Sequence, residues 1–186
     1  MRPALLDDSL AIELPASLTQ LERLVTHVGR SPWLWGNAVR FDVERRSRRV
    51  LWKSDAIEIA LFGWATGQDT LFHDHGGASG AAFVCSGVLI EDVVEAVDGH
   101  VLRRYVHRRR AESAFSFGPE YIHRVRHDPA QGVALSIHAY TPMLRDALDY
   151  EVCDDGTLAV SYDRRILRGS KWRSSRPRSH RRSSTT

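Results

Sequence analysis

The feature that most constrains the fold of this chain is a series of short apolar stretches, separated by turn signals, that begins after Pro32. Stretches of this length and spacing are typical of β-strands. The chain shows neither the strand-helix-strand alternation that predicts a parallel sheet nor a repeat at a fixed period. We therefore expect an all-β fold, an antiparallel sandwich or barrel. The expected strands are residues 39–43, 48–53, 57–64, 70–75, 81–91, 101–107, 113–117, 133–140, 150–153 and 158–162.

One segment before these stretches, residues 17–29, has the pattern of an amphipathic helix. Ser17 and Gln20 have the spacing of a capping box, which satisfies backbone N–H groups at the start of a helix. Gly29 is expected to end the helix. We expect this helix to pack outside the sheets through apolar residues at helical spacing, namely Leu18, Leu21, Leu24, Val25 and Val28.

Charge divides the chain near residue 163. All 23 acidic residues lie at or before Asp163, so that residues 1–163 have a negative net charge and the remaining residues a positive one. We predict an N-terminal extension at 1–16, one folded domain at 17–163 and a disordered basic tail at 164–186, rich in Arg and Ser. Such a tail could contact nucleic acid or acidic lipid, but charge pattern alone favours a solvated tail. No dedicated nucleic-acid role is therefore expected.

Composition argues against several other classes of protein. The chain has no apolar run close to the roughly 18 residues that a membrane span needs, and its first residues do not resemble a secretory signal. Cys85 and Cys153 are the two cysteines and form no CxxC pair, so neither a disulfide framework nor a thiolate zinc site is indicated. We expect a protein that does not enter the membrane and a cytoplasmic location.

The segment HDHGGASG places His73 and His75 two residues apart. If this segment is extended, both imidazoles project from one face of a strand, where a single cation can bind both. A third nitrogen must come from elsewhere, and His123 and His138 both lie in apolar stretches. Taken alone, an HxH pair is often a surface or hydrogen-bonded pair, and a lone His138 is more often a core residue. Four other histidines lie in the helix, in a charged segment or in the tail: His27, His100, His107 and His180.

The surroundings of the HxH pair resemble the first motif of the cupin superfamily: glycine, five residues, HxH, three or four residues, glutamate, six residues, glycine. The run GQDTLFHDH fits its beginning and Gly87 its end. Gly80 stands where the motif has its glutamate ligand. Without that carboxylate, three neutral imidazoles would leave a metal ion its full +2 charge. Imidazole ligands suit iron, zinc, copper or nickel, and three ligands leave positions open for substrate and dioxygen.

Three blocks of the chain, HDHGGASGAAFVCSGVLIE, IHRVRH and SIHAYTPML, resemble the type I cysteine dioxygenases over roughly residues 17–163. These cupin enzymes use non-haem iron and dioxygen to oxidise cysteine to cysteine sulfinic acid. The resemblance implies a cupin-type antiparallel β-barrel or jelly roll with the N-terminal helix outside it. It also implies His73, His75 and His123 as ligands of Fe(2+).

The same resemblance implies roles for residues around the metal. His138 and Tyr140 match a pair in which the histidine hydrogen-bonds the tyrosine hydroxyl beside the iron, and Ser136 precedes them in the same relay. Members of this family also bind the substrate carboxylate through an arginine on an early strand, which is Arg48 here, with Arg49 as the adjacent possibility. Because neighbours on a strand point in opposite directions, only one of the two can face the cavity.

The chain departs from the animal enzymes of this family at Gly80. In those enzymes a cysteine at that position is crosslinked to the active-site tyrosine, so we expect no crosslink here, as in bacterial members. We interpret Cys85, five residues further on, as a packing residue. The basic tail has no counterpart in the family pattern.

Two other functions are consistent with these residues. Dioxygenases of 3-mercaptopropionate share the three histidines and the Ser-His-Tyr relay, but commonly have glutamine in place of the arginine. The arginine-rich run ERRSRRV therefore favours cysteine as substrate. From a different class, a non-catalytic cupin could bind a small ligand, or nucleic acid through its tail, with zinc or no metal. The expected partners are a small thiol and dioxygen, and the sequence does not indicate an oligomeric state.

Overall fold

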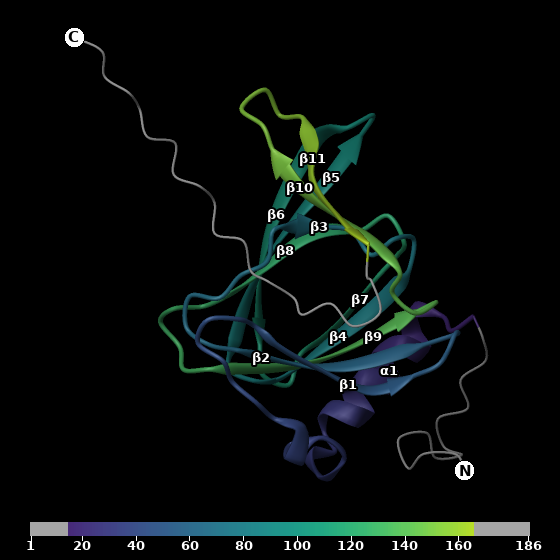
Figure 1. Ribbon diagram of the computed structural model, residues 1–186, viewed down its shortest axis with the longest axis vertical. Helices are drawn as coiled ribbons and strands as arrows, with labels where there is room; N and C mark the ends of the chain where they lie inside the picture. The colour runs from purple at the N-terminus through teal and green to yellow at the C-terminus, as the bar shows by residue number, and fades with distance from the viewer. Residues whose placement is uncertain (1–14, 166–186) are drawn as a thin grey trace.

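The computed structural model describes residues 15–165, which fold into two antiparallel sheets that face each other (Figure 1). The five-stranded sheet has the order β1-β2-β9-β4-β7 and the six-stranded sheet the order β11-β10-β3-β8-β5-β6. The predicted fold, two antiparallel sheets of an all-β domain with one helix outside them, is confirmed. The elements are α1 (Leu18–Gly29), η1 (Pro32–Leu34), η2 (Gly36–Ala38), β1 (Ser47–Lys53), β2 (Glu58–Trp64), β3 (Phe72–His73), β4 (Ser79–Ser86), β5 (Val88–Val97), β6 (His100–Arg110), β7 (Ala114–Phe117), β8 (Ile122–His127), β9 (Ala134–Thr141), β10 (Asp146–Val152) and β11 (Leu158–Arg165).

The inner strands of the five-stranded sheet, β2, β9 and β4, are buried on both faces. On β2, Ile59 and Leu61 point to the core formed with α1, whereas Phe62 and Trp64 point to the core between the two sheets. Every residue of β2 is buried, which explains why residues 59–64 form a continuous apolar run rather than an alternating one. The face turned toward the second sheet is the one that can carry a site.

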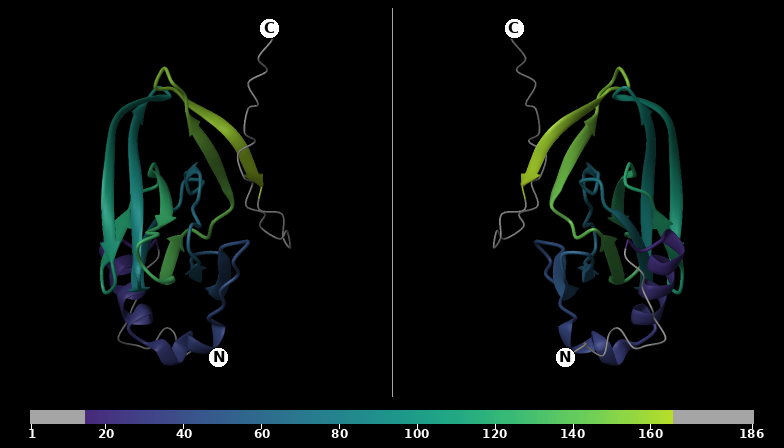
Figure 2. Two further views of the ribbon diagram at one scale, coloured as in Figure 1. Left: turned by 90° about the vertical axis from the view of Figure 1, so that its left-hand side faces the viewer. Right: turned by 90° about the vertical axis from the view of Figure 1, so that its right-hand side faces the viewer.

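Helix α1 begins as the sequence predicts and packs on the outer face of the five-stranded sheet. The Ser17 backbone N–H donates to Gln20 Oε1 at 2.8 Å, and the Gln20 N–H donates to Ser17 Oγ at 3.2 Å. Gly29 is the last helical residue and Arg30 the C-cap, so Gly29 is not the residue after the helix. An added Cβ at Gly29 would lie 2.1 Å from the Phe83 ring. The glycine is thus explained by close packing against β4. Figure 2 shows α1 at the opposite end of the molecule from the β10–β11 hairpin.

Several strand predictions differ from the structure. Residues 39–43 form no strand, and the expected strand at 81–91 is two strands separated by Gly87, whose φ is 76°. Strand β3 covers only Phe72–His73 of the predicted 70–75. Strand β8 was missed because arginines alternate with its inward residues. Its Arg124 and Arg126 form ion pairs with acidic side chains on the outer face of the sheet.

The predicted N-terminal extension and basic tail fall almost wholly outside the described residues. Strand β11 continues to Arg165, two residues past the domain boundary expected at Asp163. Within residues 15–165, no helix has the length and apolar character needed to cross a membrane.

We predict that Gly29→Ala lowers the free energy of unfolding by about 1–3 kcal/mol, the usual cost of forcing atoms into a packed core. The gain in helix propensity is at most about 1 kcal/mol and does not offset it, because the buried Phe83 ring cannot move away. Gly36→Ala is the matched control, since an added Cβ there meets nothing within 4 Å. Urea denaturation of both variants measures the difference, and equal stability of the two would contradict the packing role of Gly29.

Candidate metal centre

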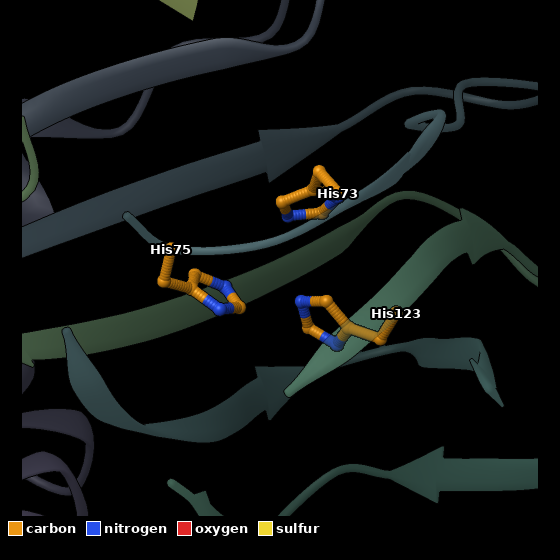
Figure 3. Close-up of side chains that lie close together, drawn as sticks. All are labelled: His73, His75 and His123. Atoms are coloured by element: carbon orange, nitrogen blue, oxygen red, sulfur yellow. The ribbon is translucent and has the colours of Figure 1, made fainter. Parts of the chain in front are cut away.

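Three histidine side chains converge between the two sheets (Figure 3). Each of His73, His75 and His123 offers a ring nitrogen, and these atoms lie within 4.8 Å of one another. The ring centroids are 4.7 to 5.2 Å apart. His75 and His123 are buried and His73 is half-buried. The structure therefore brings together the three residues predicted as metal ligands.

Strand pairing sets this convergence. His73 on β3 lies directly opposite His123 on β8, so that both side chains emerge on the same face of the six-stranded sheet. His75 follows β3 in the turn, and its ring is stacked on Phe117, with a centroid distance of 4.4 Å. The Tyr140 ring lies 5.6 Å from the His75 ring. The metal-binding face is thus bordered by aromatic rings from the opposite sheet.

Hydrogen bonds orient two of the imidazoles. His73 Nδ1 lies 3.0 Å from the backbone oxygen of Leu71, and His123 Nδ1 lies 2.7 Å from Glu91 Oε1. Because a carbonyl and a carboxylate oxygen only accept, each Nδ1 carries the proton and each Nε2 has a lone pair for a metal. This is the usual arrangement of metal-binding histidines. The residues present therefore fit a metal ion with imidazole ligands, such as iron, zinc, copper or nickel.

Asp74, between the two histidines of the HxH pair, points away from them as the alternation predicts. Its Oδ1 accepts hydrogen bonds from the backbone N–H groups of Gly76 at 3.0 Å and Leu148 at 2.9 Å. Its Oδ2 accepts one from the Tyr150 hydroxyl at 2.7 Å. Asp74 thus ties the histidine-bearing segment to β10.

A hydrogen-bonded relay lies on β9, across from the histidines. Tyr140 Oη lies 3.2 Å from His138 Nδ1, and Ser136 Oγ lies 2.9 Å from His138 Nε2. Beyond them, the Trp64 indole N–H donates to Ser136 Oγ at 3.0 Å. The family resemblance grouped Ser136, His138 and Tyr140 in one relay, but it did not point to Trp64.

The electrostatic surroundings of His138 keep its ring neutral. Burial lowers the pKa of His138 well below its usual value, and the positive charge of Arg46 lowers it further. A neutral imidazole has one donor and one acceptor nitrogen. His138 can therefore accept a hydrogen bond from Ser136 at Nε2 and donate one to Tyr140 from Nδ1.

Strand register separates the two candidate arginines. Arg48 lies opposite Phe62, whose ring faces the space between the sheets and is 4.7 Å from the His138 ring. Arg49 lies opposite Leu61, which belongs to the core under α1. The inward-facing candidate is therefore Arg48.

Arg48 already has a carboxylate partner. Its guanidinium forms an ion pair with the buried side chain of Glu58, which also accepts from Lys53 Nζ at 3.0 Å. A second guanidinium, that of Arg46, lies 4.6 Å above the rings of both Phe62 and Trp64. Sequence reasoning missed Glu58, which the pairing of β2 with β9 places opposite Tyr140, and Arg46, which directly precedes β1.

A comparison with protein families decides what kind of chain this is. The family model described as cysteine dioxygenase type I matches residues 16–152. The chain belongs to the cysteine dioxygenase type I family. Membership, together with the three-histidine site, supports an oxygen-using thiol dioxygenase. A search of curated proteins finds no match.

Three solved structures that resemble this family member have sequences 14% to 18% identical to it. A protein from Thermus thermophilus is 17% identical, with a TM-score of 0.49 over 58% of this chain and 93% of that one. An uncharacterized conserved protein with a double-stranded β-helix domain, from Klebsiella pneumoniae, is 18% identical, with a TM-score of 0.45 over 57% and 85%. A cupin superfamily protein from Desulfitobacterium hafniense is 14% identical, with a TM-score of 0.45 over 59% and 88%.

Gly80 marks where this cysteine dioxygenase family member lacks the cupin glutamate. It lies directly opposite Phe117 in the pairing of β4 with β7. A Cβ at Gly80 would lie 2.4 Å from the Phe117 ring and 3.0 Å from the backbone oxygen of Ala139. The space that a side chain at position 80 would need is therefore filled by the ring that stacks on His75.

Cys85 has the properties of a packing residue. Burial raises the pKa of its thiol to about 12, and the charge of Glu112 contributes in the same direction. The thiol is therefore protonated at neutral pH, and a protonated thiol is a poor nucleophile.

We predict that Gly80→Ala destabilises the protein by about 1–3 kcal/mol, because the new methyl group displaces the Phe117 ring. Phe117→Leu makes room for it, so the double variant should be more stable than the sum of the two single effects predicts. Thermal unfolding of the four proteins in this cycle measures the coupling. Strict additivity would show that Gly80 and Phe117 do not compete for one space.

Proposed function

We propose that this chain is an iron-dependent thiol dioxygenase that converts cysteine and dioxygen into cysteine sulfinic acid. The observation that carries the proposal is the position of three convergent imidazoles opposite the Tyr140-His138-Ser136 relay. The overall reaction, RSH + O₂ → RSO₂H, places both oxygen atoms on sulfur and needs no other reductant.

His73, His75 and His123 would hold the iron. When bound, iron(II) would supply open coordination positions and the one-electron chemistry that a thiolate needs in order to react with dioxygen. The aromatic rings of Phe117 and Tyr140 beside His75 would limit the access of water to the reacting atoms.

Arg48 would orient the substrate through its carboxylate. A guanidinium can bind a carboxylate with two parallel hydrogen bonds, which fixes both position and direction. The ion pair with Glu58 holds the Arg48 side chain on the inner face of β1 before substrate arrives. Arg46, above Phe62 and Trp64, would add positive charge on the same side and favour an anionic substrate.

The relay would direct the Tyr140 hydroxyl toward the reacting atoms. The Trp64 N–H can only donate, so Ser136 Oγ accepts from it and has its own proton to donate to His138 Nε2. His138 Nδ1–H then donates to the Tyr140 oxygen, which leaves the Tyr140 proton for the substrate side. Tyr140 would thus stabilise negative charge that develops on oxygen or sulfur.

The test is a substrate panel with the iron-loaded full-length chain. We expect dioxygen uptake with cysteine and formation of its sulfinate in equal amounts, with lower turnover of 3-mercaptopropionate and cysteamine. Oxygen-electrode rates and mass spectrometry of the product measure both. A preference for 3-mercaptopropionate would move the assignment to that substrate, and stoichiometric zinc without thiol-dependent uptake would favour a non-catalytic cupin. His123→Ala should lose iron and sulfinate formation, whereas His107→Ala, at an exposed position on β6, should retain both.

Arg48 and Arg49 provide a matched pair of variants. We expect Arg48→Gln to raise the KM for cysteine about 10- to 100-fold, the range for losing a charged hydrogen-bonded contact. Arg49→Gln should leave the KM unchanged, because that side chain lies on the opposite face of β1. Cysteamine, which lacks the carboxylate, should be turned over equally by both variants. Equal KM values for cysteine in the two variants would refute the assignment of Arg48.

A further inference from the structure

Glu91 is a buried carboxylate that contacts one of the three histidines. Its Oε1 lies 2.7 Å from His123 Nδ1 and accepts from the Tyr121 hydroxyl at 3.1 Å. Its Oε2 accepts from Nε of Arg109 at 2.7 Å. The Glu91 side chain has no exposed surface, so a negative charge is held inside the protein directly behind an imidazole.

Strand pairing places these groups in a row across the inner face of the six-stranded sheet. On β5, Val93 lies opposite His123 and Glu91 is the next inward residue, so Glu91 and His123 are diagonal neighbours. On the other side of β5, Arg109 of β6 lies opposite Leu89 and is diagonal to Glu91. The guanidinium of Arg109 is held in turn over the Phe115 ring at 4.1 Å. The row β8-β5-β6 thus provides a preformed support for His123.

The acceptors behind His73 and His123 differ in charge. His73 donates to the neutral backbone oxygen of Leu71, whereas His123 donates to the carboxylate of Glu91. A carboxylate that accepts from one imidazole nitrogen makes the other nitrogen more basic and a stronger metal ligand. His123 is therefore the stronger donor of these two ligands.

We propose that Glu91 is a positioning residue that strengthens the bond of His123 to the metal and returns part of the negative charge lost at Gly80. The carboxylate acts through the imidazole rather than as a ligand. Arg109 and Tyr121 hold the carboxylate in place and reduce the electrostatic effect of its negative charge on His123. The inference rests on the metal site of the proposed function and goes beyond it, because it assigns unequal roles to the histidines.

Metal affinity tests this inference without any catalytic turnover. Co²⁺ binding to the full-length chain is measured by competition with a chelator, for the wild type and for Glu91→Gln. Glutamine keeps the size and an acceptor oxygen but removes the charge. We expect the dissociation constant to rise about 10- to 100-fold, as for other groups that support metal-binding histidines.

Asp128→Asn is the matched control. Asp128 is another buried carboxylate, which forms an ion pair with an arginine of β6, Arg108, and accepts from the backbone N–H of Ala130 at 3.0 Å. The dissociation constant of this variant should equal that of the wild type. An unchanged constant in Glu91→Gln, or an equal loss in Asp128→Asn, overturns the inference while leaving the metal site intact. A wild-type chain that binds no Co²⁺ overturns the metal site and the inference together.

Tyr121→Phe separates a charge effect from a packing effect. Removing this hydroxyl takes one donor away from Glu91 Oε1, so the hydrogen bond from His123 to that oxygen becomes stronger. Co²⁺ should then bind as tightly as in the wild type or more tightly, opposite in direction to Glu91→Gln. With iron, Glu91→Gln should also raise the ferric/ferrous midpoint potential. Weaker Co²⁺ binding in Tyr121→Phe would mean that this cluster acts through packing alone.

Discussion

The backbone pairing that sets His73 opposite His123 is the constraint on which the rest of the site depends. Strand β3 contributes only two residues to it, and a slip of one residue would turn His73 to the outer face. The register is fixed from both ends: Thr70 Oγ1 accepts from the Val125 N–H at 2.9 Å, and Asp74 binds β10. The site is therefore held by hydrogen bonds from backbone N–H groups to the side chains of Thr70 and Asp74 beside it, as well as by its own side chains.

The sequence predicted those features that are encoded locally. The capping box of α1 needs only neighbouring residues, whereas the relay of Ser136, His138 and Tyr140 was implied by the family resemblance. Contacts between distant strands that the resemblance did not supply were out of reach: Glu91 and His123 are 32 residues apart, and Trp64 and Ser136 are 72 apart. Strand β8 was missed for a related reason, since its outward arginines are explained only by acidic partners on other segments.

The carboxylate of Glu91 contacts a proposed metal ligand, His123, rather than the metal itself. The ring of Phe117 occupies the space where a carboxylate at position 80 would lie. The carboxylate of Glu91 lies instead behind His123, neutralised in part by Arg109. Once a metal is bound, this arrangement would leave its remaining positions free for the proposed substrate and dioxygen and would still moderate the charge of the ion.

The two buried faces of the five-stranded sheet divide the residues of β9 into two sets. Ile137 and Ala139 belong to the core under α1, whereas His138 and Tyr140 face the histidines. Side chains on one face pack in the core under the helix, and those on the other form the Tyr140-His138-Ser136 relay. Substitutions at alternate positions of this one strand can therefore change the relay and the attachment of the helix independently of each other.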